Sequence, residues 1–413
     1  MFGRLLPALK GALPGPASRA LALRLARHEC PAITARRARR AEQLAAAHDD
    51  PIVWRRAAGA NVEDADGNVF VDMTAGFGGM SVGYANPAVV AAGRDRLETL
   101  PHAMGDAFPD ASRVELLEAL AARTGLAAGI LGCSGSDAVE AALKTARLAT
   151  GRDGVVAFTG GYHGLAHGAL GVTAYRADAF RAPFAGQLSP HVRFAPFAGE
   201  VGSLDGVGAV VVEVIQGRGG IRVPPTGWLA SVQRAARAAG ALLVVDEIFT
   251  GFGRTGEWFA HTSEGIEPDL LCLGKSLGGG FPISACFGTR AAMDAWGEST
   301  GEAIHTQTFL GNPVGCAMAL ATLTEVERLL PTVHASAARL RIGIERHGLR
   351  VRGRGLALGV ELNDALRTSR ALLQRGWIAL PAGERGEVLS LTPPFVLTEE
   401  QADGFVSALA AVA

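Results

Sequence analysis

The stretch Leu271-Cys-Leu-Gly-Lys-Ser-Leu-Gly-Gly-Gly-Phe-Pro-Ile-Ser284 places one lysine, Lys275, between a short apolar run and a cluster of glycines. A solvated lysine is more often flanked by polar residues, whereas these neighbours are typical of a closed site. In such a site the pKa of a lysine falls, and its neutral amine becomes a nucleophile toward carbonyl groups. The flanking Gly274-Lys-Ser276 also resembles the end of a nucleotide-binding P-loop, but that loop requires a glycine where this chain has Asp269.

A second feature lies upstream, where Ala241-Leu-Leu-Val-Val-Asp246 predicts a buried strand that ends in a carboxylate. A buried carboxylate is unfavourable unless it is paired. Two interpretations of Asp246 are open. Its partner is the protonated pyridine nitrogen of a cofactor, or Asp246 forms a structural salt bridge or a helix cap. A lysine together with a strand-end aspartate is the pair that an enzyme using pyridoxal phosphate (PLP) requires.

Three further motifs are ambiguous when each is taken alone. Ser134-Gly-Ser-Asp137 precedes a predicted helix, whose start attracts a phosphate, although an ordinary helix cap explains the same residues. Tyr162-His-Gly164 follows a predicted strand, and its aromatic ring either stacks on a flat cofactor or simply packs. Gly251–Gly256 fits the dinucleotide pattern GxGxxG, but no long amphipathic helix opens after it, so a loop is the favoured interpretation.

The bulk composition excludes several classes of protein. The chain has 413 residues and a net charge of −1, so nothing indicates a nucleic-acid surface. No apolar run approaches the length of a membrane span, and we expect no membrane association. The five cysteines are widely spread without a CxxC pair, which favours a reducing, cytoplasmic location over a disulfide framework or a zinc site, so we expect no bound metal.

Residues 1–28 contain no Asp or Glu and carry leucines at Leu21, Leu23 and Leu25. A transit peptide and a membrane-surface helix are two interpretations of this segment. An accessory amphipathic helix is the favoured one, because no small-residue cleavage site follows an apolar core of the right form.

The order of predicted elements indicates an α/β fold. Val62–Asp72 reads as a hairpin around Asp66-Gly67, and from about residue 112 apolar strands alternate with helices. This alternation predicts a large domain with a mostly parallel sheet flanked by helices, plus a smaller α+β domain. We expect an N-terminal helical segment (1–50), the first part of the small domain and a linker (51–100), the large domain (101–328) and the C-terminal small domain (329–413).

Taken together, the motifs resemble the class III aminotransferases of PLP fold type I, the family of ornithine, 4-aminobutyrate and ω-amino acid aminotransferases. The resemblance runs from about residue 50 to 410, and the order and spacing of the motifs match the family. The matching stretches are Ser134–Ala142, Gly160–Gly164, Glu213–Gly220, Asp246–Gly256, Leu273–Ile283 and His305–Pro313.

This resemblance implies the cofactor, PLP, and a role for each matching residue. Lys275 would form the Schiff base with PLP and move the proton, while Asp246 would hold the pyridine nitrogen. Thr308 would reach the phosphate bound by the neighbouring subunit, which implies a homodimer. The other cofactor contacts implied by the resemblance are Gly135 and Ser136 at the phosphate, Tyr162 on one ring face with His163 beside it, and Glu213, Gln216 and Ile248 near the cofactor.

The substrate positions depart from the family. In the ornithine and 4-aminobutyrate branches an acidic residue follows the glutamine-glycine pair, and this chain has Arg218 at that position. The arginine that pairs with the acidic residue in those branches is replaced here by Ser390. Where ornithine aminotransferases have a carboxylate-binding arginine, this chain has Leu165. Two interpretations of Arg218 are open: a relocated carboxylate clamp, or an arginine that points into solvent or pairs structurally. We also expect Phe77 on the substrate side and an apolar contribution from Phe249.

The expected activity is transfer of an amino group from an amine or ω-amino acid to a 2-oxoacid by a ping-pong mechanism. A PLP-dependent aminomutase or racemase is the alternative, and an assay without added oxoacid separates the two. A cofactor-binding protein without catalysis and a nicotinamide-dependent dehydrogenase built on Gly251–Gly256 are less favoured hypotheses. The sequence names neither the donor nor the acceptor.

Overall fold

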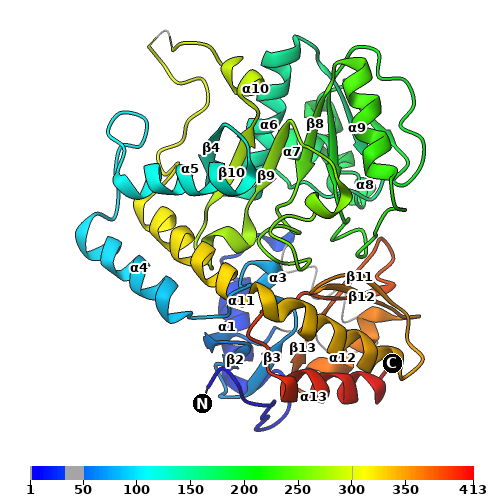
Figure 1. The fold of residues 1–413 in the computed structure, drawn as a ribbon. Helices are drawn as coiled ribbons and strands as arrows, with labels where there is room; N and C mark the ends of the chain where they lie inside the picture. The colour runs from blue at the N-terminus through cyan, green and yellow to red at the C-terminus, as the bar shows by residue number, and fades with distance from the viewer. Residues whose placement is uncertain (1, 33–50, 300) are drawn as a thin grey trace.

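The computed structural model describes residues 2–32, 51–299 and 301–413. Figure 1 shows a large sheet with its helices in the upper half of the molecule and smaller sheets with their helices below. The long helix α11 (Pro313–Glu345) runs from one half into the other. Within the described residues, no helix is both long and apolar enough to cross a membrane.

The large sheet has seven strands in the order β4-β10-β9-β8-β7-β5-β6. Strands β9, β8, β7, β5 and β6 run parallel, and β10 runs antiparallel to both of its neighbours. The predicted mostly parallel sheet is therefore confirmed. The bounds are β4 Ala128–Gly132, β5 Gly154–Phe158, β6 Val192–Ala195, β7 Val207–Glu213, β8 Leu242–Asp246, β9 Leu270–Leu273 and β10 Ser284–Gly288.

Both faces of this sheet are buried, which explains why its central strands are continuously apolar. Val211 and Val244 belong to the apolar cluster that includes helix α6, whereas Val210 and Val245 belong to the cluster that includes α9. The helices of this half are α5 Ala111–Thr124, α6 Gly135–Thr150, α7 His167–Gly171, α8 Ala177–Phe180, α9 Trp228–Ala239 and α10 Arg290–Asp294. Because β5, β7, β8 and β9 are parallel, the segments that follow them all leave from one edge of the sheet.

The lower half contains two four-stranded sheets, β1-β2-β3-β13 and β11-β12-β15-β14. The predicted hairpin forms as the antiparallel pair β2 and β3, and β13 from the C-terminal tail joins it in parallel. The strand bounds are β1 Trp54–Ala58, β2 Asn61–Asp64, β3 Val69–Asp72, β11 Val351–Arg354, β12 Ala357–Glu361, β13 Trp377–Ile378, β14 Leu380–Ala382 and β15 Val388–Leu391. The remaining helices are α3 Ala75–Gly78, α4 Pro87–Thr99, α12 Ala365–Leu373 and α13 Glu399–Ala410.

Helix α11 connects the two halves. It packs against α4 and α5 at one end and against α13 at the other. Figure 1 shows it as the yellow helix that crosses from the cyan helices to the red one. Helix α11 passes without interruption through residue 328, where the sequence predicts the boundary between the large domain and the C-terminal small domain. That boundary stays a prediction.

The N-terminal segment is attached to the hairpin. Helix α1 (Pro16–Ala26) forms within residues 1–28, and the N–H groups of Ala17 and Ser18 donate to the two carboxylate oxygens of Asp66 at 2.7 and 2.9 Å. Asp66 lies in the turn between β2 and β3, so the start of the helix is fixed on that turn. Residues 33–50, part of the predicted N-terminal helical segment, lie outside the described residues.

A fully buried arginine, Arg254, connects segments from both halves. It lies in the loop that follows β8, and its guanidinium donates to the carbonyls of Leu356 and Pro393, at 3.3 and 2.7 Å, and to the hydroxyl of Ser81, at 2.7 Å. Burial lowers the pKa of Arg254 to about 9, although the charge of Asp72 opposes the shift. The dinucleotide-like stretch Gly251–Gly256 thus carries a structural arginine.

Replacing Arg254 with alanine should destabilise the protein by about 2–4 kcal/mol, because two buried carbonyls and a hydroxyl lose their donor and a cavity remains. Urea unfolding of the holoenzyme measures the change. Arg237→Ala is the control, since Arg237 pairs with Glu267 at an exposed site, and it should change the unfolding free energy by less than about 1 kcal/mol. Equal effects of the two substitutions would contradict the role of Arg254.

Candidate active site

Lys275 lies directly after β9, at the start of a short 3-10 turn that ends at Gly278. Its φ of +43° is in the left-handed region, which is unfavourable for a residue with a side chain and is common at functional sites. The amine is 5.4 Å from the centre of the Phe249 ring. Burial lowers the pKa of Lys275, while the charges of Asp246 and Glu213 oppose the shift, so the site favours the neutral amine.

Asp246 ends β8 and is almost completely buried. One carboxylate oxygen accepts a hydrogen bond from the N–H of Ile248 at 3.0 Å, and the other lies 2.7 Å from Nδ1 of His163. Burial lowers the pKa of His163, but the hydrogen bond to Asp246 and the negative charges of Asp246 and Glu213 outweigh that effect, and the net shift is upward. His163 and Asp246 therefore form a buried hydrogen-bonded pair.

Glu213 ends β7, and its backbone is in register with that of Asp246 on the next strand. Its carboxylate accepts hydrogen bonds from the N–H groups of Tyr162, at 3.0 Å, and Gly217, at 3.2 Å. Burial raises the pKa of Glu213 to about 7, because the effect of burial and the charge of Asp246 exceed the opposing effect of His163. Glu213 thus holds two loops at the sheet edge.

The start of α6 is capped by its own side chains. Ser134 and Asp137 form a reciprocal capping box, in which each side chain accepts a hydrogen bond from the other residue's backbone N–H. Within the described part of the chain, the N–H groups of Gly135 and Ser136 have no acceptor. The cap and the anion site are therefore compatible, because they use different N–H groups.

Ile248 brings these segments together. A Cβ atom added to Gly135 would lie 3.1 Å from Cδ1 of Ile248, and one added to Gly274 would lie 3.4 Å from its Cγ2. Ile248 therefore lies between the start of α6 and the residue before Lys275. A Cβ atom at Gly164 would lie 2.2 Å from the hydroxyl of Ser136, so the loop after β5 also contacts this helix start.

A cavity of about 330 Å³ opens beside Lys275. Of the residues predicted from the sequence, it is lined by Lys275, Tyr162, Arg218, Ser390, Phe77 and Phe249. Its other lining residues are Thr74, Tyr175, Gly217, Leu380, Pro381, Ala382 and Thr392.

Leu165, Thr308 and Gln216 lie outside the lining of this cavity, as do the predicted residues Gly135, Ser136, His163, Glu213, Asp246 and Ile248. Leu165 and Thr308 are both exposed on the single chain. Gln216 is buried, and its amide donates to the carbonyl of Thr159 at 2.9 Å and accepts a hydrogen bond from Arg222 at 3.2 Å. Gln216 therefore holds the loop after β7 against the loop after β5.

The sequence interpretation missed Tyr175. The N–H groups of Ala174 and Tyr175 both donate to the carbonyl of Gly161 at 2.9 Å, which returns the chain to Tyr162. The rings of Tyr162 and Tyr175 meet edge to face with their centres 6.3 Å apart. The chain has only three tyrosines and two line the cavity, so their scarcity was a usable signal.

Known proteins show the same sequence pattern and fold. Residues 44–413 match the family described as Aminotransferase class-III. The chain belongs to the class III aminotransferases. It is 37% identical to acetylornithine aminotransferase of Archaeoglobus fulgidus, over 85% of this chain and 93% of that one, and 38% identical to acetylornithine aminotransferase of Mycolicibacterium smegmatis, over 86% and 91%.

Solved structures agree with this membership of the class III aminotransferases. Ornithine aminotransferase from Toxoplasma gondii superposes with a TM-score of 0.84 at 28% identity, over 97% of this chain and 96% of that one. A PLP-bound amine transaminase from an uncultivated Pseudomonas species gives a TM-score of 0.80 at 27% identity, over 88% and 95%. The predicted family, PLP fold type I and aminotransferase activity are confirmed, and nothing in these similarities supports the aminomutase alternative.

The cofactor of this aminotransferase is PLP, and the residues present fit it. Unpaired N–H groups at Gly135 and Ser136 suit a phosphate, and the buried carboxylate of Asp246 suits a protonated ring nitrogen. A partly buried lysine with a lowered pKa borders a cavity that also contains a tyrosine ring. The close approach of Gly135 to Ile248 leaves little room for a side chain at this glycine.

Glu213 should make stability depend on pH. Its pKa is raised to about 7 in the folded protein, so the folded state binds this proton more tightly than the unfolded state. Stability should therefore fall as the pH rises from about 4.5 to about 7, by up to about 1.4 kcal/mol per pH unit. Glu213→Gln should flatten this slope in urea unfolding at pH 5 and pH 7.

Glu267→Gln is the matched control, because the side chain of Glu267 is 83% exposed and should leave the pH slope unchanged. An identical slope in wild type and Glu213→Gln would contradict the assignment.

Proposed function

We propose that this aminotransferase takes the amino group of an amine or ω-amino acid and passes it to a 2-oxoacid in two half-reactions at Lys275. The observation that carries this proposal is the position of Lys275, whose amine has a lowered pKa and borders a cavity open to small molecules. A neutral amine at this place can accept a proton from the substrate carbon and return it.

When bound, PLP supplies an electron sink for the negative charge that proton removal leaves on the substrate. Asp246, hydrogen-bonded to His163, would hold the pyridine nitrogen. The N–H groups of Gly135 and Ser136 would bind the phosphate. Glu213 fixes the backbone of Tyr162, whose ring would contact the cofactor.

The surroundings of Lys275 favour proton transfer over hydration. Phe249 lies against the amine, and Phe77 lines the same cavity. Ser276 donates to the carbonyl of Gly78 at 2.9 Å, and its hydroxyl lies 2.5 Å from that of Ser81. This pair of hydroxyls holds the segment after Phe77 against the turn of Lys275.

Lys275→Ala should lower transamination by at least about a thousandfold, because the amine is both nucleophile and proton carrier. The measurement is consumption of pyruvate or 2-oxoglutarate with a panel of amines, and parallel lines in double-reciprocal plots are expected of the two half-reactions. Lys144→Ala is the control, since Lys144 is a helical lysine outside the cavity. Borohydride reduction followed by peptide mapping should label Lys275, and labelling elsewhere would reject the assignment.

We also propose that the protein is a homodimer in which Thr308 reaches the partner's phosphate site. Two loops, residues 101–108 and 304–312, lie together and form what we call the loop-pair surface. Thr306 donates to Asp106 at 3.1 Å and Asn312 donates to the carbonyl of Pro101 at 3.0 Å. Large apolar side chains are exposed on this surface: Met104, Phe108, Ile304 and Phe309.

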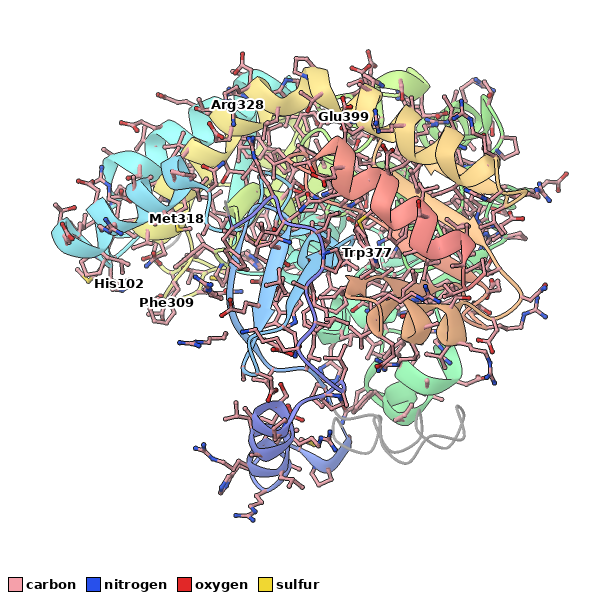
Figure 2. The ribbon with its side chains drawn as sticks, turned by 90° about the horizontal axis from the view of Figure 1, so that it is seen from below. His102, Phe309, Met318, Arg328, Trp377 and Glu399 are labelled. Atoms are coloured by element: carbon pink, nitrogen blue, oxygen red, sulfur yellow. The ribbon has the colours of Figure 1, made fainter. Side chains whose placement is uncertain are left out.

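The exposed apolar side chains support an interface, because monomeric proteins rarely expose a contiguous patch of this kind. Figure 2 shows His102 and Phe309 side by side at the outer margin of the molecule, and their ring centres are 5.3 Å apart. Cys133, next to the start of α6, donates through its thiol to the carbonyl of Phe309 at 3.5 Å. The loop-pair surface is therefore adjacent to the phosphate-binding turn.

Phe309→Asp should convert the dimer to a monomer with a mass of 42.7 kDa, because a charge replaces an apolar contact in the interface. Light scattering coupled to gel filtration measures the mass. The matched control is Ile342→Asp, at an exposed position of α11 outside the loop-pair surface, which should stay dimeric. A wild-type protein that is monomeric at micromolar concentration would refute the proposal.

A cytoplasmic location is part of the proposed function. All five cysteines carry free thiols, and three of them are buried. Free thiols of this kind persist in a reducing compartment.

A further inference from the structure

The cavity beside Lys275 is mostly apolar and contains few charged groups. Among its lining residues, the cations are Lys275 and Arg218, and there is no carboxylate. Ser390, Thr392 and Thr74 contribute hydroxyl groups. Since Lys275 serves the chemistry, Arg218 is the cation that can bind a charged group of the substrate.

Arg218 lies over two aromatic rings. Its guanidinium carbon lies 4.8 Å from the centre of the Tyr162 ring and 5.6 Å from that of Tyr175. The backbone of the same residue is fixed, because its carbonyl accepts a hydrogen bond from the N–H of Gly383 at 2.9 Å, and the carbonyl of Gly383 accepts one from the hydroxyl of Tyr175 at 3.3 Å. The arginine is therefore oriented before any ligand arrives.

The donors of Arg218 have no acidic partner in the described part of the chain. Neighbouring arginines differ in this respect: Arg222 donates to the side chain of Gln216, and Arg352 pairs with Glu361 and donates to the carbonyl of Gly220. Neither ring offers an oxygen acceptor to the guanidinium at its face, so the N–H groups of Arg218 stay available for a planar acceptor. A carboxylate is the acceptor that matches this edge with two parallel hydrogen bonds.

We propose that Arg218 is the carboxylate-binding residue of this aminotransferase, and that its acceptor is a 2-oxoacid with one carboxylate and a small apolar body. Among the described residues of this chain, the apolar cavity offers no further cation to a second carboxylate, and leaving such a charge unpaired is strongly unfavourable. Pyruvate is the simplest member of the favoured class, and 2-oxoglutarate, with two carboxylates, is disfavoured. The inference rests on the proposed function and narrows it to a class of acceptor.

The test compares initial rates of the holoenzyme with pyruvate and with 2-oxoglutarate as acceptor. Wild type should have the higher kcat/KM for pyruvate. Arg218→Ala should raise the KM for pyruvate by about tenfold to a hundredfold, the range expected for loss of a charge-assisted hydrogen-bonded pair, with kcat changed by less than about threefold. Arg218→Lys keeps the positive charge but cannot form two parallel hydrogen bonds, so its KM for pyruvate should lie between those of wild type and Arg218→Ala.

Two further measurements separate substrate binding from structural effects. Propionate, a monocarboxylate without a reactive carbonyl, should bind the wild-type holoenzyme and lose affinity in Arg218→Ala by the same factor as the KM of pyruvate. An aromatic amine without a carboxylate should lose much less kcat/KM in Arg218→Ala than pyruvate does, in the first half-reaction followed by the absorbance of the bound cofactor. Arg123→Ala is the control, since Arg123 also stacks on an aromatic ring, that of Trp258 at 5.0 Å, outside the cavity.

The outcomes distinguish this inference from the proposed function. An unchanged KM for pyruvate in Arg218→Ala, or a wild-type preference for 2-oxoglutarate, would overturn the role of Arg218 while transamination remains. Absence of amino transfer from every amine tested, with no borohydride label on Lys275, would overturn both.

Discussion

The site depends on carboxylates buried at the ends of parallel strands. Asp246 ends a strand whose other residues are apolar, and an unpaired charge there would be strongly destabilising. His163 and the N–H of Ile248 remove that penalty for Asp246, and Glu213 on the next strand is satisfied by the N–H groups of Tyr162 and Gly217. The same bonds fix the loops that contain the site, so the polar network and the geometry of the cavity have one origin.

A second network links the site to the lower half of the molecule. Arg254 binds carbonyls that lie next to β12 and β15, and the same guanidinium binds Ser81, whose hydroxyl contacts Ser276 beside Lys275. Buried hydrogen bonds therefore connect the small sheets to the turn of the lysine. The cavity is likewise shared, because Leu380, Pro381 and Ser390 come from those sheets and Lys275 from the large one.

Much of the fold was predictable because the patterns are local. The hairpin at residues 62–72 and the strand β8 follow from turn residues and an apolar run, and they form where predicted. The antiparallel direction of β10 was not predictable, because an apolar strand buried on both faces has the same pattern in either direction. Pairing of β13 with β3 joins residues 377 and 71, which no local pattern connects.

The sequence by itself determined the family and the chemistry, because the lysine, the strand-end aspartate and the helix-start glycines occur in a fixed order along one chain. It left the direction of Arg218 open between a ligand clamp and a solvent-facing arginine. Only the tertiary structure decided that Arg218 lines the cavity, since its stacking on Tyr175 and the bond to Gly383 join residues distant in sequence. It also showed that Leu165 lies outside the cavity, because exposure depends on how the loop after β5 folds back and not on the residues beside it.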